Sequence, residues 1–452
     1  MTTQRIRTVR GTGRATAAAV AALCAVAALP GPAWAAGDAP YAYDSAAQQV
    51  KGAATTSNSA QLKPGSVYRD TISQTGKQYY RVDLDGQHNA YVSVVAVPPS
   101  GGKAEYADGI KVTLQDGSGS RCGSQETQFG SGGYTRPITA YAVREVDQAG
   151  DNDSCASPGA YYVLVERTSA ATSTPTDWGL ELRHVTEPAL KAAGPTQAPE
   201  EWPSASPQPP PGGPTKRHGG TSLFEATGLG EGEWRDDIEP GQTLFYRVPV
   251  DWGQQVFVGA ELGSSPTGDD FVSNALTLTL ANPAGGHVDD DRLSYNGKQA
   301  TMGLEPQPPV AYENRFDSDT SSSAMRFAGW YYLSATLSPD MAKEYGDKAL
   351  PLTLRLNVTG QAQEGPGYVG DPGPFTVTDD DRDAAADGQS GSDASTGGTM
   401  KLVAAAGLGA GAVLLLGLGG WTLVARRRAA QEAARLPART QEPTQYGPPP
   451  AW

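Results

Sequence analysis

Two acidic groups are the side chains whose type and spacing come closest to a chemical site in this sequence. Asp269 and Asp270 form one group, and Asp289, Asp290 and Asp291 form the other, each beside Gly, Asn and Ser residues that are typical of loops. Carboxylate oxygens presented by loops are the ligands that Ca²⁺ prefers. The spacing matches neither an EF-hand nor a nonapeptide repeat. The alternatives are therefore calcium bound at one of these loops, or two solvated acidic loops.

Signals for catalysis are weaker. The four histidines, none within five residues of another His or of a Cys, are His88, His184, His218 and His287. The Gly-x-Ser-x-Gly string of a nucleophile elbow does not occur. Residues 319–323, DTSSS, fit the Asp-x-Ser-x-Ser of a metal-dependent adhesion site, but a polar stretch precedes them instead of an apolar strand. We therefore expect no catalytic residue and no cofactor other than the calcium alternative.

Two cysteines are expected to form a disulfide. Cys24 lies in an apolar N-terminal run that we expect to be removed, and Leu23 before it is too large for a lipid-attachment motif. Cys122 and Cys155 then remain, and in an exported chain an even pair is typically oxidised. The bond would stabilise its domain by about 3 to 4 kcal/mol. A pair of metal-binding thiolates is the alternative, but it lacks neighbouring ligands.

The two ends of the chain predict a single-pass surface protein. Residues 1–35 carry four arginines, an apolar run and an Ala-Trp-Ala site, the pattern of a secretory signal peptide. Residues 402–425 carry no charge and would be about 36 Å long as a helix, enough to span a bilayer. Three arginines follow immediately, which places residues 426–452 in the cytoplasm and the N-terminal part outside the cell membrane.

The expected extracellular part is acidic. Between Ala36 and Met400 there are 25 Lys and Arg residues against 47 Asp and Glu residues, a formal balance of −22, whereas the whole chain has −14. Such a surface repels nucleic acid and favours cations or basic partners. A solvated surface that charge keeps in solution is the simpler interpretation.

An internal repeat organises the chain. At an offset of 166 residues, Tyr68 to Val94 and Trp234 to Ala260 share eight identities, among them Asp70 with Asp236. Three further pairs of similar stretches follow in the same order, beginning at residues 110 and 276, 159 and 329, and 180 and 352. Four anchors in one order indicate a duplicated domain of about 140 residues.

The repeated stretches predict β-strands. Leu276, Leu278 and Leu280 alternate with Thr277 and Thr279, so one face of this strand is expected to be buried and the other wet. Turn residues separate such stretches, and no long amphipathic helix lies between them, which favours antiparallel sheets packed as a sandwich. The sequence thus predicts an all-β chain of two tandem β-sandwiches.

The repeated motifs resemble a known family. The order Tyr/Trp-Arg-Asp-x-Ile, then Tyr-Arg-Val, then Leu-x-Leu, then Ala-Gly-x-Tyr-Tyr is similar to the bacterial pre-peptidase C-terminal domain, over roughly residues 65–185 and 230–358. Residues 241–262 also resemble actinobacterial membrane-anchored surface proteins. The resemblance implies jelly-roll-like domains that act as accessory or substrate-binding modules, some of which bind calcium. No peptidase domain precedes either copy, which departs from the usual arrangement.

The expected organisation has seven segments. They are a signal peptide at 1–35, β-sandwich domains at 36–188 and 220–360, a Pro-rich linker at 189–219, a disordered acidic stalk at 361–400, a transmembrane helix at 402–425 and a cytoplasmic tail at 426–452. Within the stalk, residues 393–397 resemble a sortase signal around Thr396, so wall attachment is an alternative to retention in the membrane.

Two groups of side chains are further candidate sites. Arg81 and Arg247 fall on outward positions, and we expect them to pair with Asp85 and Asp251 or with Asp70 and Asp236. The aromatic residues that could stack on sugars if exposed, although most are expected in the cores, are Tyr161, Tyr162, Trp234, Trp252, Trp330, Tyr331 and Tyr332.

The sequence therefore favours a non-catalytic cell-surface protein that binds an envelope glycan or protein through its two sandwiches. A membrane-spanning regulator, signalling through the Pro-rich tail to a cytoplasmic partner, is the first alternative. A hydrolase acting outside the membrane is the second. Deletion of Arg435 to Trp452 would distinguish the first two, because an adhesive role does not need the tail.

Overall fold

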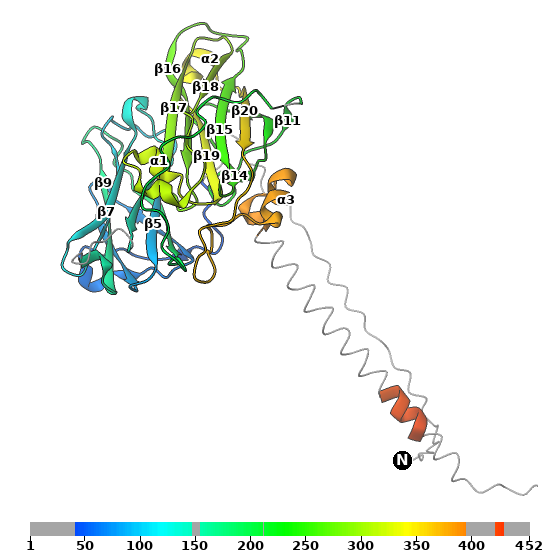
Figure 1. Cartoon of the computed structure of the whole chain (residues 1–452). Coiled ribbons are helices and arrows are strands. Elements are labelled where there is room, and N and C mark those ends of the chain that lie inside the picture. The colour runs from blue at the N-terminus through cyan, green and yellow to red at the C-terminus, as the bar shows by residue number, and fades with distance from the viewer. Residues whose placement is uncertain (1–40, 147–153, 211, 395–420, 429–452) are drawn as a thin grey trace, which may run out of the picture. The chain divides into compact units, whose positions relative to one another are not determined.

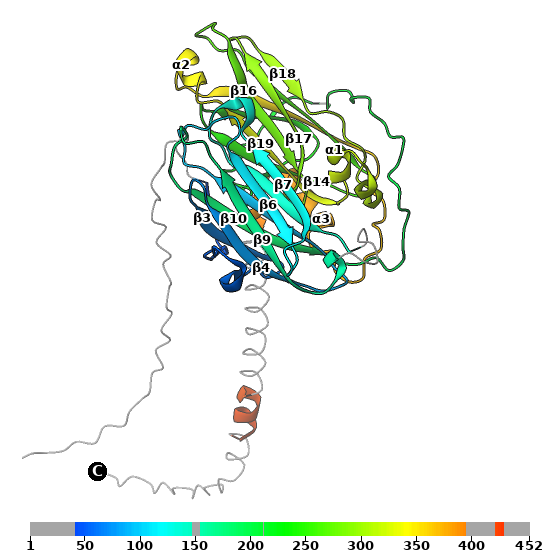
Figure 2. The same ribbon diagram turned by 90° about the vertical axis from the view of Figure 1, so that its left-hand side faces the viewer.

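The computed structural model describes residues 41–146, 154–210, 212–394 and 421–428. It contains four five-stranded sheets, which make two β-sandwiches (Figures 1 and 2). The expectation of two tandem sandwiches is confirmed.

The first sandwich packs two mainly antiparallel sheets face to face. One sheet has the order β1-β3-β10-β5-β8, with strands Gln48–Gln49, Ser66–Ile72, Trp178–Glu187, Asn89–Val97 and Ile138–Arg144. The other has the order β2-β4-β9-β6-β7, with strands Ala60–Gln61, Lys77–Leu84, Gly159–Thr168, Gly109–Gln115 and Arg121–Gln128. Because the first and last long strands, β3 and β10, are neighbours, the order is that of a jelly roll.

The second sandwich repeats this order strand for strand. One sheet has the order β11-β13-β20-β15-β18, with strands Thr215–Lys216, Gly232–Ile238, Leu350–Thr359, Gln255–Leu262 and Ala300–Gly303. The other has the order β12-β14-β19-β16-β17, with strands Thr227–Gly228, Thr243–Val250, Gly329–Leu337, Val272–Ala281 and His287–Tyr295. Even the short parallel bridges correspond, β1 to β3 and β11 to β13. The two copies therefore share one topology, as the sequence repeat predicts.

Alternation along the strands builds each core. In β3 the side chains of Tyr68, Asp70 and Ile72 are buried, whereas those of Arg69 and Thr71 are exposed. Each sandwich has its own apolar cluster of inward residues. Strand β5 differs, since eight of its nine residues are buried, because its outer face lies against the second half of the chain.

Short helices occupy the connections. They are η2 at Thr56–Asn58, η3 at Gly130–Gly132, η4 at Ser154–Ala156, η5 at Tyr312–Phe316, α1 at Thr320–Ala324, α2 at Met341–Tyr345 and α3 at Asp379–Asp387.

The segment after the second sandwich differs from the expected disordered stalk as far as residue 394. Phe375 is fully buried, and α3 begins with a capping box formed by Thr378 and Asp381. Asp381 also accepts a hydrogen bond from Trp330 Nε1 at 2.8 Å, and Ala384 and Ala385 are buried against the sandwich. The acidic composition suggested disorder, but capping and two buried alanines hold this helix.

The linker contacts both the second sandwich and the segment that follows it. Leu190 forms a β-bridge with Tyr368, and Pro203 O accepts a hydrogen bond from Gln255 Nε2 at 2.8 Å.

Within the described ranges, no helix combines the length and apolar character that crossing a bilayer requires. The expected signal peptide, the motif around Thr396, the cytoplasmic tail beyond residue 428 and most of the expected span at 402–425 lie outside those ranges.

Candidate binding site

An aromatic cluster joins the two sandwiches. Tyr91 of β5 makes an edge contact with Phe327, their ring centroids 5.1 Å apart, and Phe327 stacks on Phe375 at 4.5 Å. Tyr141 of β8 and Ala284 of the β16–β17 turn complete this buried contact. The contact residues come from both halves of the chain, so the two cores meet through a third, smaller one.

A buried ion pair lies beside this cluster. Glu187, at the end of β10, and Arg315, in η5, are 2.7 Å apart, and both side chains are 0% exposed. Tyr91 and Tyr368 donate hydroxyl hydrogen bonds to the same carboxylate at 2.8 and 2.7 Å. Burial alone raises the pKa of Glu187, but Arg315 and the hydrogen-bond donors outweigh it, so the pKa lies below its usual range. The charge is fully compensated, which makes this cluster structural.

A second pair reinforces the first. Arg326 Nη1 lies 2.5 Å from Glu145 Oε1, and Arg326 Nη2 donates to the Tyr141 hydroxyl at 3.1 Å. Two residues of the first sandwich thus hold an arginine of the second.

Two glycines allow this close approach. A Cβ on Gly285 would come within 2.6 Å of Ser93 Cβ, and one on Gly286 within 2.6 Å of Tyr141 Cζ. The turn between β16 and β17 therefore needs residues without side chains where it meets β5 and β8.

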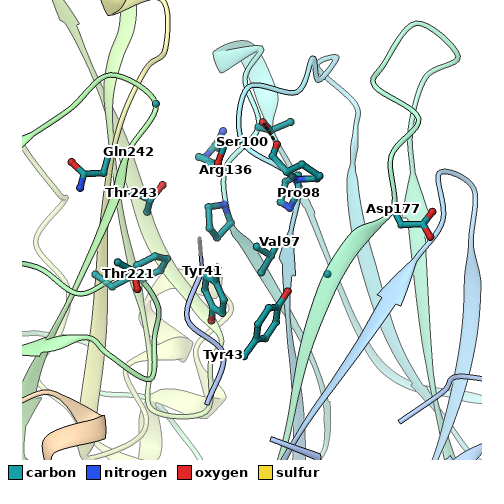
Figure 3. A pocket seen from close by; sticks show the side chains of 16 residues that line it. Tyr41, Tyr43, Val97, Pro98, Ser100, Arg136, Asp177, Thr221, Gln242 and Thr243 are labelled. Carbon is teal, nitrogen blue, oxygen red and sulfur yellow. Dashed lines mark hydrogen bonds between the residues drawn. The ribbon is translucent and has the colours of Figure 1, made fainter. Parts of the chain in front are cut away.

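A cavity of about 280 Å³ lies elsewhere along the same junction. The residues from the first half of the chain that line it include Tyr41, Tyr43, Val97, Pro98, Arg136 and Asp177, and those from the second half include Thr221, Gln242, Thr243 and Phe245. Figure 3 shows the segment that carries Tyr41 and Tyr43 between strands of the two sandwiches. The Tyr41 ring contacts Tyr43 and Phe245 edge-on, with centroid distances of 5.1 and 5.9 Å.

Glu181 anchors this N-terminal segment. Its carboxylate accepts hydrogen bonds from the Tyr41 hydroxyl at 3.3 Å and the Asp44 amide at 3.4 Å. Burial raises the pKa of Glu181 to about 7. Gly179, two residues earlier, lies so close to the Tyr43 hydroxyl that a Cβ at this position would force the Tyr43 side chain to move. Two residues of β10 thus position the segment: Glu181 through its hydrogen bonds, and Gly179 by leaving room for the Tyr43 side chain.

Arg136 belongs to the wall of this cavity and of a smaller one of about 70 Å³. The smaller cavity lies between β7–β8 and β16–β17, and His287, Asp290 and Arg292 also line it. The cavity walls thus combine aromatic rings with cations, which suits a polar ligand that also presents flat apolar faces.

The five candidate calcium ligands do not come together. Asp269 and Asp270 lie in an exposed loop before β16, as expected, whereas Asp289, Asp290 and Asp291 lie within β17, so their expected loop position is wrong. The physical reason is that β17 pairs along its length with β16. Within the residues that the structure places, no group of three or more His, Cys, Asp or Glu side chains could hold a metal ion.

Each member of the second acidic group already has a partner. Asp289 accepts a hydrogen bond from the Glu305 amide at 2.9 Å, and Asp291 from the Arg292 amide at 2.7 Å. Asp290 lies 3.0 Å from His287 Nε2 and 2.9 Å from Arg292 Nη2. These hydrogen bonds and charges lower the pKa of Asp290, with the bond to His287 the largest cause.

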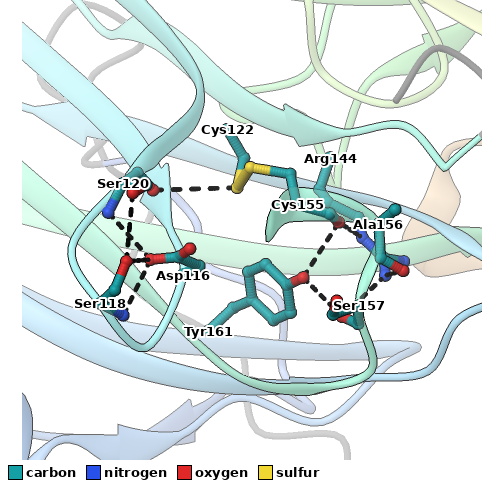
Figure 4. The surroundings of a disulfide bond; sticks show 9 residues. All are labelled: Asp116, Ser118, Ser120, Cys122, Arg144, Cys155, Ala156, Ser157 and Tyr161. Atoms are coloured by element: carbon teal, nitrogen blue, oxygen red, sulfur yellow. Dashed lines mark hydrogen bonds between the residues drawn. A yellow bond between two sulfur atoms is a disulfide. The ribbon is translucent and has the colours of Figure 1, made fainter. Parts of the chain in front are cut away.

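The expected disulfide is present (Figure 4). Cys122 of β7 and Cys155 of η4 are bonded, with their Cα atoms 5.6 Å apart. The Cys155 carbonyl accepts hydrogen bonds from Arg144 Nε at 2.6 Å and the Tyr161 hydroxyl at 2.9 Å. The disulfide therefore ties η4 to β7, and the Arg144 hydrogen bond joins the end of β8 to η4.

The repeated arginines do not form the expected pairs. Arg81 pairs with Asp83 at 2.7 Å, and Arg247 is buried beneath Trp330, with its guanidinium 4.1 Å from the ring centroid. The α3 segment covers Trp330, which is why the outward face of β14 is not wet. The adhesion-like motif is a helix cap, since Asp319 accepts from the Ser322 amide at 2.8 Å at the start of α1.

The aromatic candidates divide between core and partly exposed positions. Tyr161, Trp252 and Tyr331 are buried, whereas Tyr162, Trp234, Trp330 and Tyr332 are half-buried.

Residue patterns alone did not identify one repeated inward pair. The carboxylate of Asp70 accepts hydrogen bonds from the Tyr80 hydroxyl at 2.9 Å and the Gly52 amide at 2.6 Å. Asp236 does the same with Tyr246 at 2.7 Å and Gly219 at 2.8 Å. The sequence does carry this pattern, because Asp70 and Tyr80 correspond to Asp236 and Tyr246 at the offset of 166 residues. All four side chains lie on inward positions of their strands.

Comparisons with known proteins add little. Neither protein families nor curated proteins showed a match. Among solved structures, Broad Bean Stain Virus shows 11% identity over 70% of this chain and 96% of its own, with a TM-score of 0.19. The tandem CBM22 domains of Paenibacillus barcinonensis Xyn10C show 12% identity over 66% and 92%, with a TM-score of 0.17. The ANX1 ectodomain of Arabidopsis thaliana shows 9% identity over 69% and 92%, also at 0.17. Scores this low carry no argument, so function rests on the site itself.

Proposed function

We propose that this chain is a non-catalytic, single-pass protein of the cell surface that binds an envelope glycan at the junction of its two sandwiches. The observation that carries the proposal is the cavity of about 280 Å³ between them. Its volume is near the lower end of ligand pockets, roughly 300 Å³, which suits a small part of a longer chain.

The chemistry of the cavity wall supports a saccharide. Tyr41, Tyr43 and Phe245 offer aromatic faces and edges, on which sugar rings pack through their C–H faces. Arg136, Asp177 and the hydroxyls of Thr221 and Thr243 offer donors and acceptors for sugar hydroxyls. Such a wall supplies contacts for recognition.

The cellular placement is part of the proposal. The signal-like N-terminus and the apolar stretch at 402–425 motivate it. Residues 421–428 are helical, and the side chains of Trp421, Leu423 and Val424 are exposed. Exposed apolar residues directly before three arginines fit the cytoplasmic end of a membrane span.

Binding to isolated envelope polysaccharide tests the proposal. Full-length protein in detergent should be retained by the polysaccharide, and Tyr43→Ala should reduce retention at least tenfold because a ring is lost from the cavity wall. Tyr106→Ala is the matched control, since Tyr106 lies in the first sandwich, 66% exposed and outside the cavity. Retention should persist with a chelator. Equal retention of both variants, or none by the wild type, would refute the proposal.

A further inference from the structure

Arg136 is a buried cation without a carboxylate partner. Its side chain belongs to a residue only 8% exposed, and its Nη1 atom is buried with no hydrogen bond. Nη2 donates to the Phe129 carbonyl at 3.2 Å, and the guanidinium lies 5.5 and 5.6 Å from the ring centroids of Phe129 and Tyr134. These neutral partners only partly replace water around a charged group.

The surrounding charges compensate Arg136 only in part, because Asp290 attracts its guanidinium while Arg292 repels it. The nearest acidic group in the smaller cavity, Asp290, is already engaged by His287 at 3.0 Å and Arg292 at 2.9 Å. Across the part of the chain that the structure describes, no salt bridge to Arg136 is formed. The part of the cavity wall around Arg136 is therefore locally cationic, although the whole chain carries a formal charge of −14.

The position of Arg136 connects it with a ligand. It lines both the cavity of about 280 Å³ and the adjoining cavity of about 70 Å³. The second sandwich closes over it, since the Tyr134 hydroxyl lies 2.9 Å from Thr277 Oγ1. A group that enters from the larger cavity would thus meet a desolvated guanidinium beside the tyrosine rings.

We propose that the junction cavity binds a saccharide that carries an oxyanion, either a carboxylate or a phosphate, and that Arg136 neutralises this oxyanion. The inference rests on the proposed function and specifies its ligand. A guanidinium forms paired, charge-assisted hydrogen bonds with either group, and these are stronger than bonds between neutral partners. In a site with little water the gain is larger, because Arg136 forms no salt bridge to any described residue with which the oxyanion would compete.

Titration calorimetry with defined probes tests the ligand class. Full-length protein in detergent would be titrated with a glucuronic acid disaccharide, a disaccharide phosphate and the neutral disaccharide of the same length. At least one charged probe should bind ten or more times tighter than the neutral one, and the better of the two identifies the oxyanion. Equal affinity for all three would overturn the inference while leaving the proposed function intact. No binding of any probe, together with no retention on polysaccharide, would remove both.

Variants assign the effect to Arg136. Arg136→Gln should abolish the preference for charged probes and keep the weak binding of the neutral one, and Arg136→Lys should restore part of the preference. Arg81→Gln is the control, because Arg81 is an exposed arginine of the same sandwich that pairs with Asp83. Inorganic phosphate or acetate alone should bind far more weakly, since they lack the sugar ring. Tight binding of these free anions would overturn the saccharide part of the inference.

The melting temperature separates a binding role from a structural one. Without ligand, Arg136→Gln should melt at the same temperature as the wild type or higher, because it removes a buried charge that forms no salt bridge with the residues that the structure places. A fall of several degrees with an unchanged preference for charged probes would show that Arg136 is structural and would overturn the inference.

Discussion

The ionisation of a carboxylate at the junction, and its contribution to stability, depend on its burial and on its hydrogen-bond partners. Both side chains of the Glu187–Arg315 pair are 0% exposed. Three side chains besides Arg315 donate hydrogen bonds to Glu187, those of Asn89, Tyr91 and Tyr368. Glu181 accepts only two from the described residues, at 3.3 and 3.4 Å. The pKa of Glu187 is therefore lowered and this carboxylate stays ionised, whereas Glu181, with a pKa of about 7, is about half protonated near pH 7.

Arg315→Ala should destabilise the protein by about 3 to 5 kcal/mol, because Glu187 would remain as an unpaired buried charge. Arg355→Ala is the control. Arg355 also contacts two carboxylates, Glu233 and Glu261, but it is 30% exposed, so its loss should cost about 1 kcal/mol or less. Scanning calorimetry measures both. Equal losses would contradict the assigned role of burial.

The raised pKa of Glu181 predicts that the stability of the protein depends on pH. Its pKa is 4.5 as a free side chain and about 7 in the folded chain, so the folded state binds the proton more tightly. The stabilisation is fully present below pH 4.5 and is lost as the pH rises through 7, a change of about 3 kcal/mol. Glu181→Gln, which stays neutral, should remove this loss and be the more stable protein at pH 8.

Unfolding measured by fluorescence between pH 5 and 8 tests this pH dependence. Glu166→Gln is the matched control, since Glu166 pairs with the exposed Lys77 and should leave the pH profile unchanged. A wild-type profile that is flat over this interval would show that burial does not perturb Glu181.

At the scale of elements, the strands could be predicted and the segments between them could not. Period-two alternation and the repeat at 166 residues identified the sandwiches, because each strand buries one face against the facing sheet of its sandwich. Helix α3 was missed because acidic composition suggested disorder. Its Thr378-x-x-Asp381 capping box was visible in the sequence, but its docking depends on Trp330, about 50 residues earlier.

The repeated Tyr–Asp hydrogen bond should contribute equally to the two sandwiches. Tyr80→Phe and Tyr246→Phe each remove one hydroxyl that donates to a buried carboxylate, and each should cost about 1.5 to 3 kcal/mol. The double variant should show the sum, because the sites lie in separate cores. Tyr79→Phe, on the other face of β4, should change stability little. A strongly non-additive double variant would contradict independent cores.

At the scale of the whole molecule, the junction was not predictable from the sequence. Glu187 and Arg315 are 128 residues apart, and neither belongs to a motif. Gly286 has no sequence signature that distinguishes it from other turn glycines, although it lets the second sandwich meet Tyr141. Coupling between the two sandwiches thus arises from three-dimensional contacts alone.

Gly286→Ala should loosen this coupling, since its Cβ would come within 2.6 Å of Tyr141. The wild type should unfold in one cooperative calorimetric transition, and the variant should show two separated transitions or a broadened one. Gly230→Ala is the control, because nothing lies within 4 Å of the added carbon. Two transitions already present in the wild type would show that the junction does not couple the sandwiches.

The most direct test of the proposed surface role is labelling of intact bacterial cells that produce the full-length chain. A membrane-impermeant maleimide should label the Tyr106→Cys variant, whose altered side chain is exposed on the first sandwich. It should label the Arg435→Cys variant, in the expected cytoplasmic tail, only after the cells are permeabilised. Labelling of Arg435→Cys but not Tyr106→Cys in intact cells would contradict the account.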